Sequence, residues 1–472
     1  MTNIYAITDS HQESRNLSKL LSGIYNIEKD LNKPFLVLDA GDLFKGIYDK
    51  ELSVNAYIKL KQLLPQAEIF ITLGNNDFGF TKTDFEYLKK IAEKFKNAGI
   101  NIICANLHPN FVSKYKIIEI NNEKLLITGF CLNNSCAKKF KCELTTPENE
   151  LKSLIQNITE DFDKIIVLNH NWYPYSKKLK EAAQEIGYDI ELIIGGHEHS
   201  PINPDFDNMI FYPLSFARSM FKFKLDKKIK KIQEISLNEI DFINEFESPI
   251  LEYEEKTELK KPIAKRVLNL TKCYSDPCPL GTFISDNMKR IGNSDIAFHS
   301  TGFSMYPLRK EDSENITMYD LKQVMCKSET NIEKVELTTM QLKEVFENAT
   351  SWRMYKDRGN SKFLQCSQNI TITGIGNTSD KTYKIIQIEI NGEKLLDEQQ
   401  TPINPERKFS CTIDNYVGNG EQGFEMLKDI TKTKILENDK PILISELFYN
   451  SVINAPNKYT QPEYPTFKII DL

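Results

Sequence analysis

The sequence lacks the features of a secreted or membrane-spanning chain. Its first residues, MTNIYAITDSH, contain neither the basic segment nor the apolar segment of a signal peptide. Nowhere among the 472 residues is there an apolar run of about 18 residues, the length that a membrane span needs. We therefore expect a cytoplasmic protein without a membrane segment, although a secreted protein whose leader has been removed would look the same.

Cysteines in a disulfide or metal-binding pattern are also lacking. The chain has 9 cysteines, an odd number at irregular spacings, and those at 131, 136 and 142 do not form C-x₂-C pairs. This pattern is typical of reduced thiols and argues against both a disulfide framework and a thiolate zinc site.

The chain has no excess of positive charge. Its 60 basic and 66 acidic residues give a formal charge of -6, which argues against a general electrostatic grip on nucleic acid or on acidic membranes. A small anionic substrate would have to be bound at one site, by metal ions or by dipoles oriented toward it. The length predicts two or three domains, and 40% hydrophobic residues are enough to build their cores. Nothing in the sequence indicates an oligomeric state.

Short apolar runs alternate with stretches of helical periodicity in the first half of the chain. The apolar runs are residues 3–9, 35–42, 69–77, 101–107, 124–130, 164–170 and 190–199. This alternation predicts a layered α/β domain over residues 1–243. Polar residues follow nearly all of these runs, and open α/β sheets bind their ligands at the carboxyl ends of strands.

A change in composition separates the two halves of the chain. Residues 244–266 carry their acidic side chains early and their basic side chains late, an order that complements the dipole of a helix. We therefore predict a solvated linker helix over 244–266. Residues 267–472 have helix and strand patterns of their own and are long enough to form a separate domain.

Five short polar segments follow the apolar runs of the first half, and they contain four of the six histidines. The segments are Asp9-Ser-His11, Gly41-Asp42, Gly74-Asn75-Asn76-Asp77, His170 and Gly196-His197-Glu-His199. Each alone has an ordinary explanation, since Gly-Asp is a common turn pair and a lone histidine is more often structural. Their joint occurrence at strand ends indicates a metal site. Carboxylates, imidazoles and an amide oxygen suit first-row divalent metals better than calcium or magnesium cages or all-thiolate zinc sites.

These segments resemble the motifs of the calcineurin-like metallophosphoesterases, which run DxH, GD, GNH(D/E), H and GHxH. The whole chain resembles the two-domain 5'-nucleotidase family of that superfamily. In the second half, PLGTFISDNM (279–288), SDIAF (294–298), FLQCS (363–367) and GEQGF (420–424) fall where that family has its markers. The resemblance implies an α/β fold, in which a four-layer α-β-β-α domain is followed by a C-terminal, substrate-binding α+β domain of the 5'-nucleotidase type.

The resemblance also implies a centre of two divalent ions, which could be Mn, Zn, Fe or Co. One ion would be held by Asp9, His11 and His199, the other by Asn75, His170 and His197; Asp42 would bridge them and Asp77 would orient the ligands. Two cations about 3.5–4 Å apart acidify a shared water to hydroxide and clamp phosphoryl oxygens. The function implied is metal-dependent hydrolysis of a nucleotide or a related small phosphoester.

Asn76 departs from the family pattern, because it stands where the family has a catalytic histidine. An amide donates and accepts hydrogen bonds but cannot deliver a proton as an imidazolium can. General acid catalysis contributes a factor of about 10²–10⁴, so monoesters with poor leaving groups should be hydrolysed slowly. Phosphodiesterases of the same superfamily also have a residue other than histidine here. A phosphodiesterase acting on cyclic or other diesters is therefore the alternative function.

The predicted substrate-binding residues of the second half depart from the pattern as well. They are His299, Ser304, Gln422 and Phe424. Ser304 replaces the arginine of an NGGGxR-like loop, Gln422 replaces an aspartate, and residues 326–329 stand near a PFGN-like segment. Phe424 would either stack on a base or pack in the core. Since half of the nucleoside clamp is altered, a weakly catalytic binding or regulatory protein is a second alternative.

Overall fold

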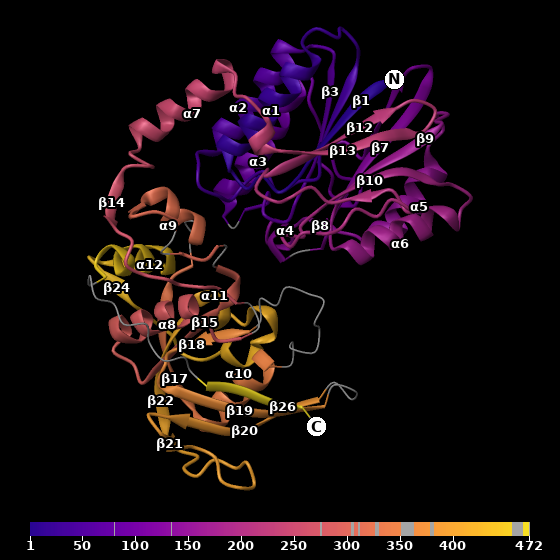
Figure 1. The fold of residues 1–472 in the computed structure, drawn as a ribbon. Coiled ribbons are helices and arrows are strands. Elements are labelled where there is room, and N and C mark those ends of the chain that lie inside the picture. The colour runs from indigo at the N-terminus through magenta and orange to yellow at the C-terminus, as the bar shows by residue number, and fades with distance from the viewer. Residues whose placement is uncertain are drawn as a thin grey trace. The chain divides into compact units, whose positions relative to one another are not determined.

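The chain divides into two compact units. The computed structural model describes residues 1–472 except 80, 134, 274–275, 304–305, 310–311, 326–329, 351–362, 378–381, 456–465 and 472. The units are Met1–Thr257 and Glu258–Leu472 (Figure 1), so they divide within the predicted 244–266 linker. In the part of the chain that the structure describes, no helix combines the length and the apolar character needed to cross a membrane.

Two β-sheets form the centre of the first unit. The first sheet has the strand order β13-β12-β1-β2-β3-β4 and the second has the order β11-β10-β9-β7-β6. The strands of the first sheet are β1 (Thr2–Ile7), β2 (Phe35–Asp39), β3 (Ala67–Thr72), β4 (Asn101–Ile103), β12 (Ser219–Leu225) and β13 (Ile229–Ser236). Those of the second are β6 (Tyr115–Ile120), β7 (Glu123–Cys131), β9 (Lys164–His170), β10 (Ile190–Gly196) and β11 (Ile210–Phe211). A small two-stranded sheet pairs β5 (Leu107–His108) with β8 (Glu143–Leu144).

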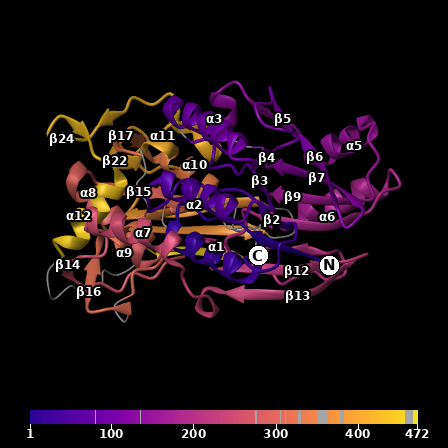
Figure 2. The same ribbon diagram turned by 90° about the horizontal axis from the view of Figure 1, so that it is seen from above.

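Helices cover the outer face of each sheet, so the first unit has four layers (Figures 1 and 2). On the first sheet lie α1 (Ser14–Glu28), α2 (Lys50–Leu63) and α3 (Lys82–Asn97), which share one hydrophobic cluster with its strands. On the second lie α5 (Pro147–Asn157) and α6 (Tyr173–Gln184), which share another. A short helix, α4 (Ser135–Lys139), precedes β8. The predicted α-β-β-α architecture is confirmed.

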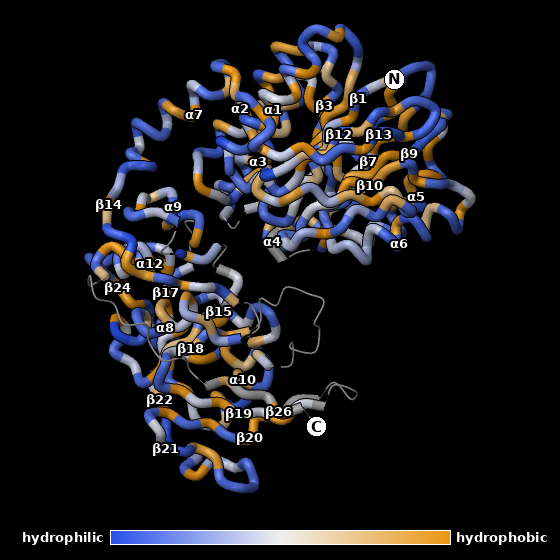
Figure 3. Tube along the Cα trace, in the orientation of Figure 1, coloured by the Kyte–Doolittle hydropathy of each residue, from blue (hydrophilic) through white to orange (hydrophobic). Residues whose placement is uncertain are grey.

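The central strands are apolar at successive positions because both of their faces are buried. In β1, Ile4 and Ala6 lie in the cluster between the two sheets, whereas Tyr5 and Ile7 lie in the cluster beneath the helices. A strand with one wet face would alternate apolar and polar residues, so continuous apolar runs are typical of sheets covered on both sides. Figure 3 shows these hydrophobic stretches along strands such as β9 and β10.

The predicted linker helix over 244–266 is corrected by the structure. Helix α7 spans only Asn244–Lys256, and a strand, β14, occupies Pro262–Lys265. The helix ends before Pro262, and Pro262 begins the strand. Nor is α7 solvated all round, because Phe246 and Ile250 are buried and it packs against α1 and α2. The order of its charges predicted the helix, but the prediction did not take account of the apolar side chains that it buries.

The second unit combines two further sheets with helices. The five-stranded sheet has the order β18-β15-β22-β17-β23 and the four-stranded sheet has the order β21-β20-β19-β26. The strands are β14, β15 (Ile296–Ser300), β16 (Asn315–Thr317), β17 (Ile332–Thr338), β18 (Leu364–Cys366), β19 (Ile370–Asn377), β20 (Thr382–Ile390), β21 (Glu393–Lys394), β22 (Lys408–Asp414), β23 (Thr433–Lys434), β24 (Leu436–Glu437), β25 (Lys440–Pro441) and β26 (Thr466–Asp471). The helices are α8 (Pro279–Gly292), α9 (Met318–Val324), α10 (Thr339–Thr350), α11 (Asn415–Gly418) and α12 (Ile444–Ile453). One hydrophobic cluster joins α10 to both sheets, and another packs α8 and α12 together.

Strand direction brings the polar segments of the first unit to matching strand ends. Strands β1, β2 and β3 run parallel in the first sheet, and β9 and β10 run parallel in the second. The chain then turns sharply through left-handed backbone, which four of the predicted ligands adopt, with φ of 45° at Asp9, 45° at His11, 57° at Asp42 and 80° at His197. Such conformations are strained for residues with a side chain and tend to cluster at functional sites.

Gly41 provides a test of how tightly the turns after β2 and β3 are packed. It has φ of +92°, and a Cβ atom there would lie 2.7 Å from the backbone nitrogen of Gly74. Gly187 has a similar φ of +83° but nothing within 4 Å of its Cβ position. We expect Gly187→Ala to lower the free energy of unfolding by about 1–2 kcal/mol through backbone strain alone. Gly41→Ala should lower it by a further 1–3 kcal/mol or so, because the clash is with backbone. Equal losses in urea denaturation of the two variants would contradict this packing.

Candidate metal centre

The loops that carry the first ligand candidates are joined by main-chain hydrogen bonds. Beyond the ends of β1 and β2, the backbone nitrogens of Asp9, His11 and Gln12 donate to the carbonyl oxygens of Gly41, Asp42 and Leu43, at 2.9, 2.9 and 3.0 Å. Main-chain hydrogen bonding between the two segments therefore continues into the loops, beyond the last strand pair of Ile7 and Asp39. The relative positions of Asp9, His11 and Asp42 are consequently fixed by backbone rather than by their side chains.

Asp77 joins the loop after β3 to the loop after β2. Its carboxylate accepts hydrogen bonds from the backbone nitrogens of Gly74 at 2.8 Å, Asp42 at 3.1 Å and Phe44 at 3.0 Å. Burial and the neighbouring charge of Asp42 raise the pKa of Asp77 to about 7, against the three N–H donors, which favour the charged form. Asp77 thus holds together the two loops that flank the site. Its role in orienting the metal ligands stays a prediction.

The predicted ligands fall into two groups of side chains. Asp9, His11 and His199 form one group, and Asp42, His170 and His197 form the other; within each group the potential donor atoms all lie within 4.8 Å of one another. Asn75 adds its amide oxygen to the second group, 3.2 Å from Nε2 of His170. The structure therefore brings together all seven residues proposed as ligands.

The shortest distance within the first group is the one expected between two ligands of one ion, and the others are somewhat longer. Nε2 of His11 lies 3.0 Å from Nε2 of His199, and Nε2 of His199 lies 3.6 Å from Oδ1 of Asp9. Two ligands about 2.1 Å from one cation, at 90–110° to each other, would be separated by about 3.0–3.4 Å. Two imidazole nitrogens that close need a shared proton or cation between them. The donor set fits first-row divalent ions.

Backbone carbonyls orient two of the imidazoles. Nδ1 of His170 lies 2.8 Å from the carbonyl oxygen of Ala40, and Nδ1 of His11 lies 3.3 Å from that of Phe44. A carbonyl only accepts, so in each ring Nδ1 carries the hydrogen and Nε2 is directed at the cluster. This arrangement is typical of histidines that bind metal ions.

The electrostatics of the cluster suit cation binding. Burial would raise the pKa of Asp42, but the charge and hydrogen bond of His170 hold it well below its usual range. Burial lowers the pKa of His11 to about 4, and burial together with His170 lowers that of His197 to about 3. For His170, Asp42 outweighs burial and raises the pKa to about 10. The carboxylate of Asp42 and two imidazoles are thus ready to bind at neutral pH, whereas His170 would release a proton on binding.

Aromatic rings enclose the imidazoles. The ring of Phe216 lies 5.4 Å from that of His11 and 5.2 Å from that of His199, and Trp172 lies 4.3 Å from His197. Phe216 has a left-handed φ of 63°, and its backbone nitrogen donates to the carbonyl oxygen of Asp9 at 2.6 Å. Sequence reasoning missed Phe216, because no motif marks the segment after β11.

Asn76 lies between a carboxylate and an ammonium group. Its backbone nitrogen and its Nδ2 donate to the carboxylate oxygens of Asp42 at 2.8 and 2.6 Å, and its Oδ1 accepts from Nζ of Lys45 at 3.1 Å. Both Asn76 and Lys45 are partly exposed. Lys45 was not singled out in the sequence, since it follows the Gly-Asp pair without any spacing of its own.

Two predicted substrate residues of the second unit are corrected by the structure. Phe424 is fully buried in the cluster that joins both sheets, so its ring is not available to stack on a base. His299 is 1% exposed, and its Nδ1 donates to the carbonyl oxygen of Ser300 at 2.8 Å. Gln422 is partly exposed and has a left-handed φ of 56°. Ser304 and residues 326–329 lie outside the described residues.

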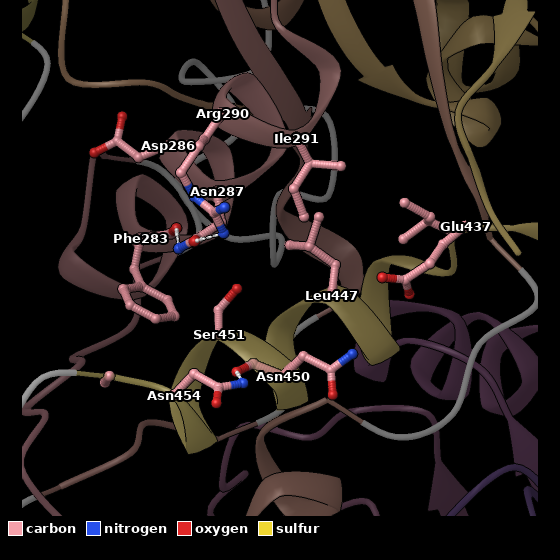
Figure 4. A pocket seen from close by; sticks show the side chains of 12 residues that line it. Phe283, Asp286, Asn287, Arg290, Ile291, Glu437, Leu447, Asn450, Ser451 and Asn454 are labelled. Atoms are coloured by element: carbon pink, nitrogen blue, oxygen red, sulfur yellow. Dashed lines mark hydrogen bonds between the residues drawn. The ribbon is translucent and has the colours of Figure 1, made fainter.

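A cavity of about 690 Å³ lies in the second unit between α8 and α12, apart from the predicted substrate residues (Figure 4). Some of its polar lining groups are bonded within the helices. Asn287 donates to the carbonyl oxygen of Phe283 and accepts from Arg290, and Asn454 donates to the carbonyl oxygen of Asn450. We assign the cavity no role.

Comparisons with known proteins agree with this geometry. The family model of calcineurin-like phosphoesterases matches residues 2–201, and that of the 5'-nucleotidase C-terminal domain matches residues 256–429. An apyrase from Tabanus yao is 25% identical over 489 residues, covering 90% of this chain and 84% of the relative. A 5'-nucleotidase precursor from Thermus thermophilus shares the fold with a TM-score of 0.75 at 16% identity, covering 99% of both chains. The sulfate thiohydrolase SoxB of the same species has a TM-score of 0.69 at 13% identity, covering 96% of this chain and 82% of its own.

The fold and the site together define a metallophosphoesterase. More narrowly, the chain belongs to the calcineurin-like phosphoesterases that carry a C-terminal 5'-nucleotidase domain. The resemblance inferred from the motifs is thereby confirmed, and so is the phosphoester hydrolase activity that it implied. The fold similarity to SoxB does not extend to its substrate, since one fold can carry several chemistries.

Asp77 can be tested as a residue that orients the ligands. In Asp77→Asn, an NH₂ group would face backbone N–H donors where a carboxylate oxygen now accepts. We expect metal affinity to fall about 10–100-fold, measured by calorimetric titration of the metal-free protein with Mn²⁺. Glu28→Gln is the matched control, because Glu28 is a buried carboxylate bonded to Tyr5 at 2.6 Å, beside the amino end of β1. That variant should lose stability and keep its metal affinity; equal effects of both variants on Mn²⁺ binding would refute the role of Asp77.

Proposed function

We propose that the chain hydrolyses nucleotides with the help of two divalent ions, drawn from Mn, Zn, Fe and Co. One ion would bind Asp9, His11 and His199, and the other would bind Asn75, His170 and His197, with Asp42 shared between them. The observation that carries this proposal is the place of Asp42. Its Oδ2 lies 3.5 Å from Nε2 of His11 and 3.3 Å from Nε2 of His170, one imidazole from each group.

A nucleotide substrate is supported by the second unit and by the names of the relatives. The C-terminal family model is that of 5'-nucleotidases, and the apyrases from Tabanus yao and Anopheles gambiae each match 90% of this chain. The charge of the chain gives no general attraction for polyanions, so a small phosphate would be held by the centre itself.

Bound divalent ions would supply an acidified water and neutralise the phosphoryl oxygens. The residues of the chain hold the reacting groups in place. Asp77 and the main-chain bonds fix the loops, and Asn76 fixes both oxygens of Asp42. Access would come from the side of His199, whose side chain is 35% exposed while Asp9 and Asp42 are fully buried. Such a site stabilises transition-state charge by fixed groups rather than by a covalent intermediate.

Asn76 favours substrates whose leaving group needs no proton. Its amide is bonded to Asp42 and Lys45 and carries no proton that it can transfer. The leaving oxygen of AMP is an alkoxide, which leaves poorly unless protonated, whereas a phosphate or an aryl oxide leaves readily. Cyclic and other diesters are the second candidate substrates, and those with an aryl leaving group fit this argument directly.

Hydrolysis assays separate these possibilities. With Mn²⁺ present, we expect release of phosphate from ADP and AMP, with ADP the faster, and loss of activity after removal of metal by a chelator. Asp42→Asn should be inactive. A 2',3'-cyclic nucleotide and bis-p-nitrophenyl phosphate serve as diester arms, and a clear preference for them over both nucleotides would replace the nucleotidase by a phosphodiesterase. Full metal loading with turnover of none of these substrates would favour a binding protein.

Asn76→His tests the explanation for the altered motif. A protonated imidazole at this position could protonate the alkoxide leaving group, and a positioned general acid contributes about 10²–10⁴-fold. We expect AMP hydrolysis to rise relative to ADP hydrolysis by at least about tenfold, measured as the ratio of kcat/KM values. Asn76→Gln keeps an amide and should leave the ratio unchanged. If the ratio is the same in both variants, the missing proton is not what limits AMP.

A further inference from the structure

The loop after β2 holds Lys45 in a strained and closely fixed conformation. Lys45 has φ of 72°, a left-handed value that is strained for a residue with a side chain. The backbone is anchored on both sides: Phe44 donates to Asp77 at 3.0 Å and Gly46 donates to Oε1 of Gln12 at 2.6 Å. The lysine side chain therefore leaves the loop from a defined position, three residues after the central carboxylate of Asp42.

The ammonium group of Lys45 is directed toward the metal centre by Asn76. Its Nζ lies 3.1 Å from Oδ1 of Asn76, whose Nδ2 lies 2.6 Å from Oδ2 of Asp42. A side-chain amide has both the acceptor that an ammonium needs and the donor that a carboxylate needs. Asn76 therefore holds a cation close to Asp42 without a direct contact between the two charges.

Lys45 is accessible from outside the cluster. Lys45 and Asn76 are partly exposed, whereas Asp9 and Asp42 are fully buried. A group approaching the centre from solvent would meet this ammonium at the rim.

We propose that Lys45, positioned by Asn76, binds a phosphoryl oxygen of the substrate. This inference rests on the proposed function and names a contact within the same site. An ammonium is a compact cation with three donors, a chemistry that suits a phosphoryl oxygen. Asn76 acts through Lys45 and Asp42 and is thus a positioning residue.

Binding of inorganic phosphate to the full-length, Mn²⁺-loaded protein tests the contact without turnover. Hydrogen bonds between charged groups are stronger than those between neutral groups. Lys45→Met should therefore weaken phosphate binding roughly tenfold or more in calorimetry, with unchanged Mn²⁺ content. Lys45→Arg keeps the positive charge and should retain most of the affinity. Lys50→Met is the matched control, because Lys50 lies on α2 with Nζ 3.6 Å from Asp84. Wild-type phosphate affinity in Lys45→Met would overturn the proposal, and so would an equal loss in Lys50→Met.

A double-mutant cycle tests the positioning by Asn76. Asn76→Leu should weaken phosphate binding in the wild-type background and have a much smaller effect in the Lys45→Met background. If Asn76 served only to support Asp42, its replacement would cost the same in both backgrounds, and this part of the proposal would be wrong. Thermal unfolding monitors folding, and Lys45→Gln replaces Lys45→Met if the latter does not fold.

The outcomes also separate this inference from the proposed function. Phosphate affinity that depends on Lys45, in a protein that hydrolyses neither ADP nor AMP, would reject the nucleotidase and retain the contact. Nucleotide hydrolysis with a phosphate affinity independent of Lys45 would retain the nucleotidase and reject the contact.

Discussion

Two carboxylates without any solvent exposure impose the main constraint on the first unit. Asp9 and Asp42 are both fully buried, and each disfavours the ionised form of the other. Burying an unpaired charge is very costly, so such groups persist only with opposite charges or directed donors around them. The imidazoles, the backbone N–H groups and the amide of Asn76 supply that compensation. Replacing one partner would leave a buried charge without its counterpart, which is why the site depends on the whole set of loops.

Much of the first unit could be predicted because its signals are local in the sequence. Apolar runs mark strands buried on both faces, and residues placed just after such runs must gather where parallel strands end. That argument was enough to select Asp9, His11 and His170 as neighbours. It could not select Lys45 or Phe216, whose positions depend on left-handed backbone and on contacts between distant loops. The four-layer arrangement came from the resemblance to a family rather than from periodicity.

The second unit was harder to interpret for a physical reason. An aromatic residue after a glycine-rich turn has the same sequence pattern whether its ring stacks on a ligand or packs inside. Phe424 packs inside, and His299 likewise satisfies its ring within the unit. Helix α7 shows the same difficulty, since its exposed charges predicted solvation while its other face packs against α1 and α2. Whether a side chain is buried depends on which distant segment of the chain packs against it, and the local sequence pattern does not predict that segment.

The main-chain bonds between the loops after β1 and β2 set the spacing of the ligands in this centre, whereas the side chains set the kind of donor atom. Asp9 and His11 are placed by hydrogen bonds of their own backbone nitrogens to Gly41 and Asp42, and these donors are present whichever side chain other than proline the residue carries. A ligand can therefore be exchanged for one with another kind of donor atom while the hydrogen-bonded backbone keeps its position. A harder or softer cation could be accommodated by exchanging single side chains, because softness is a property of the donor atom and spacing is a property of the backbone. The preference for one metal over another can therefore change through single side chains, while the spacing of the ligands is kept by the backbone of the sheet and its loops.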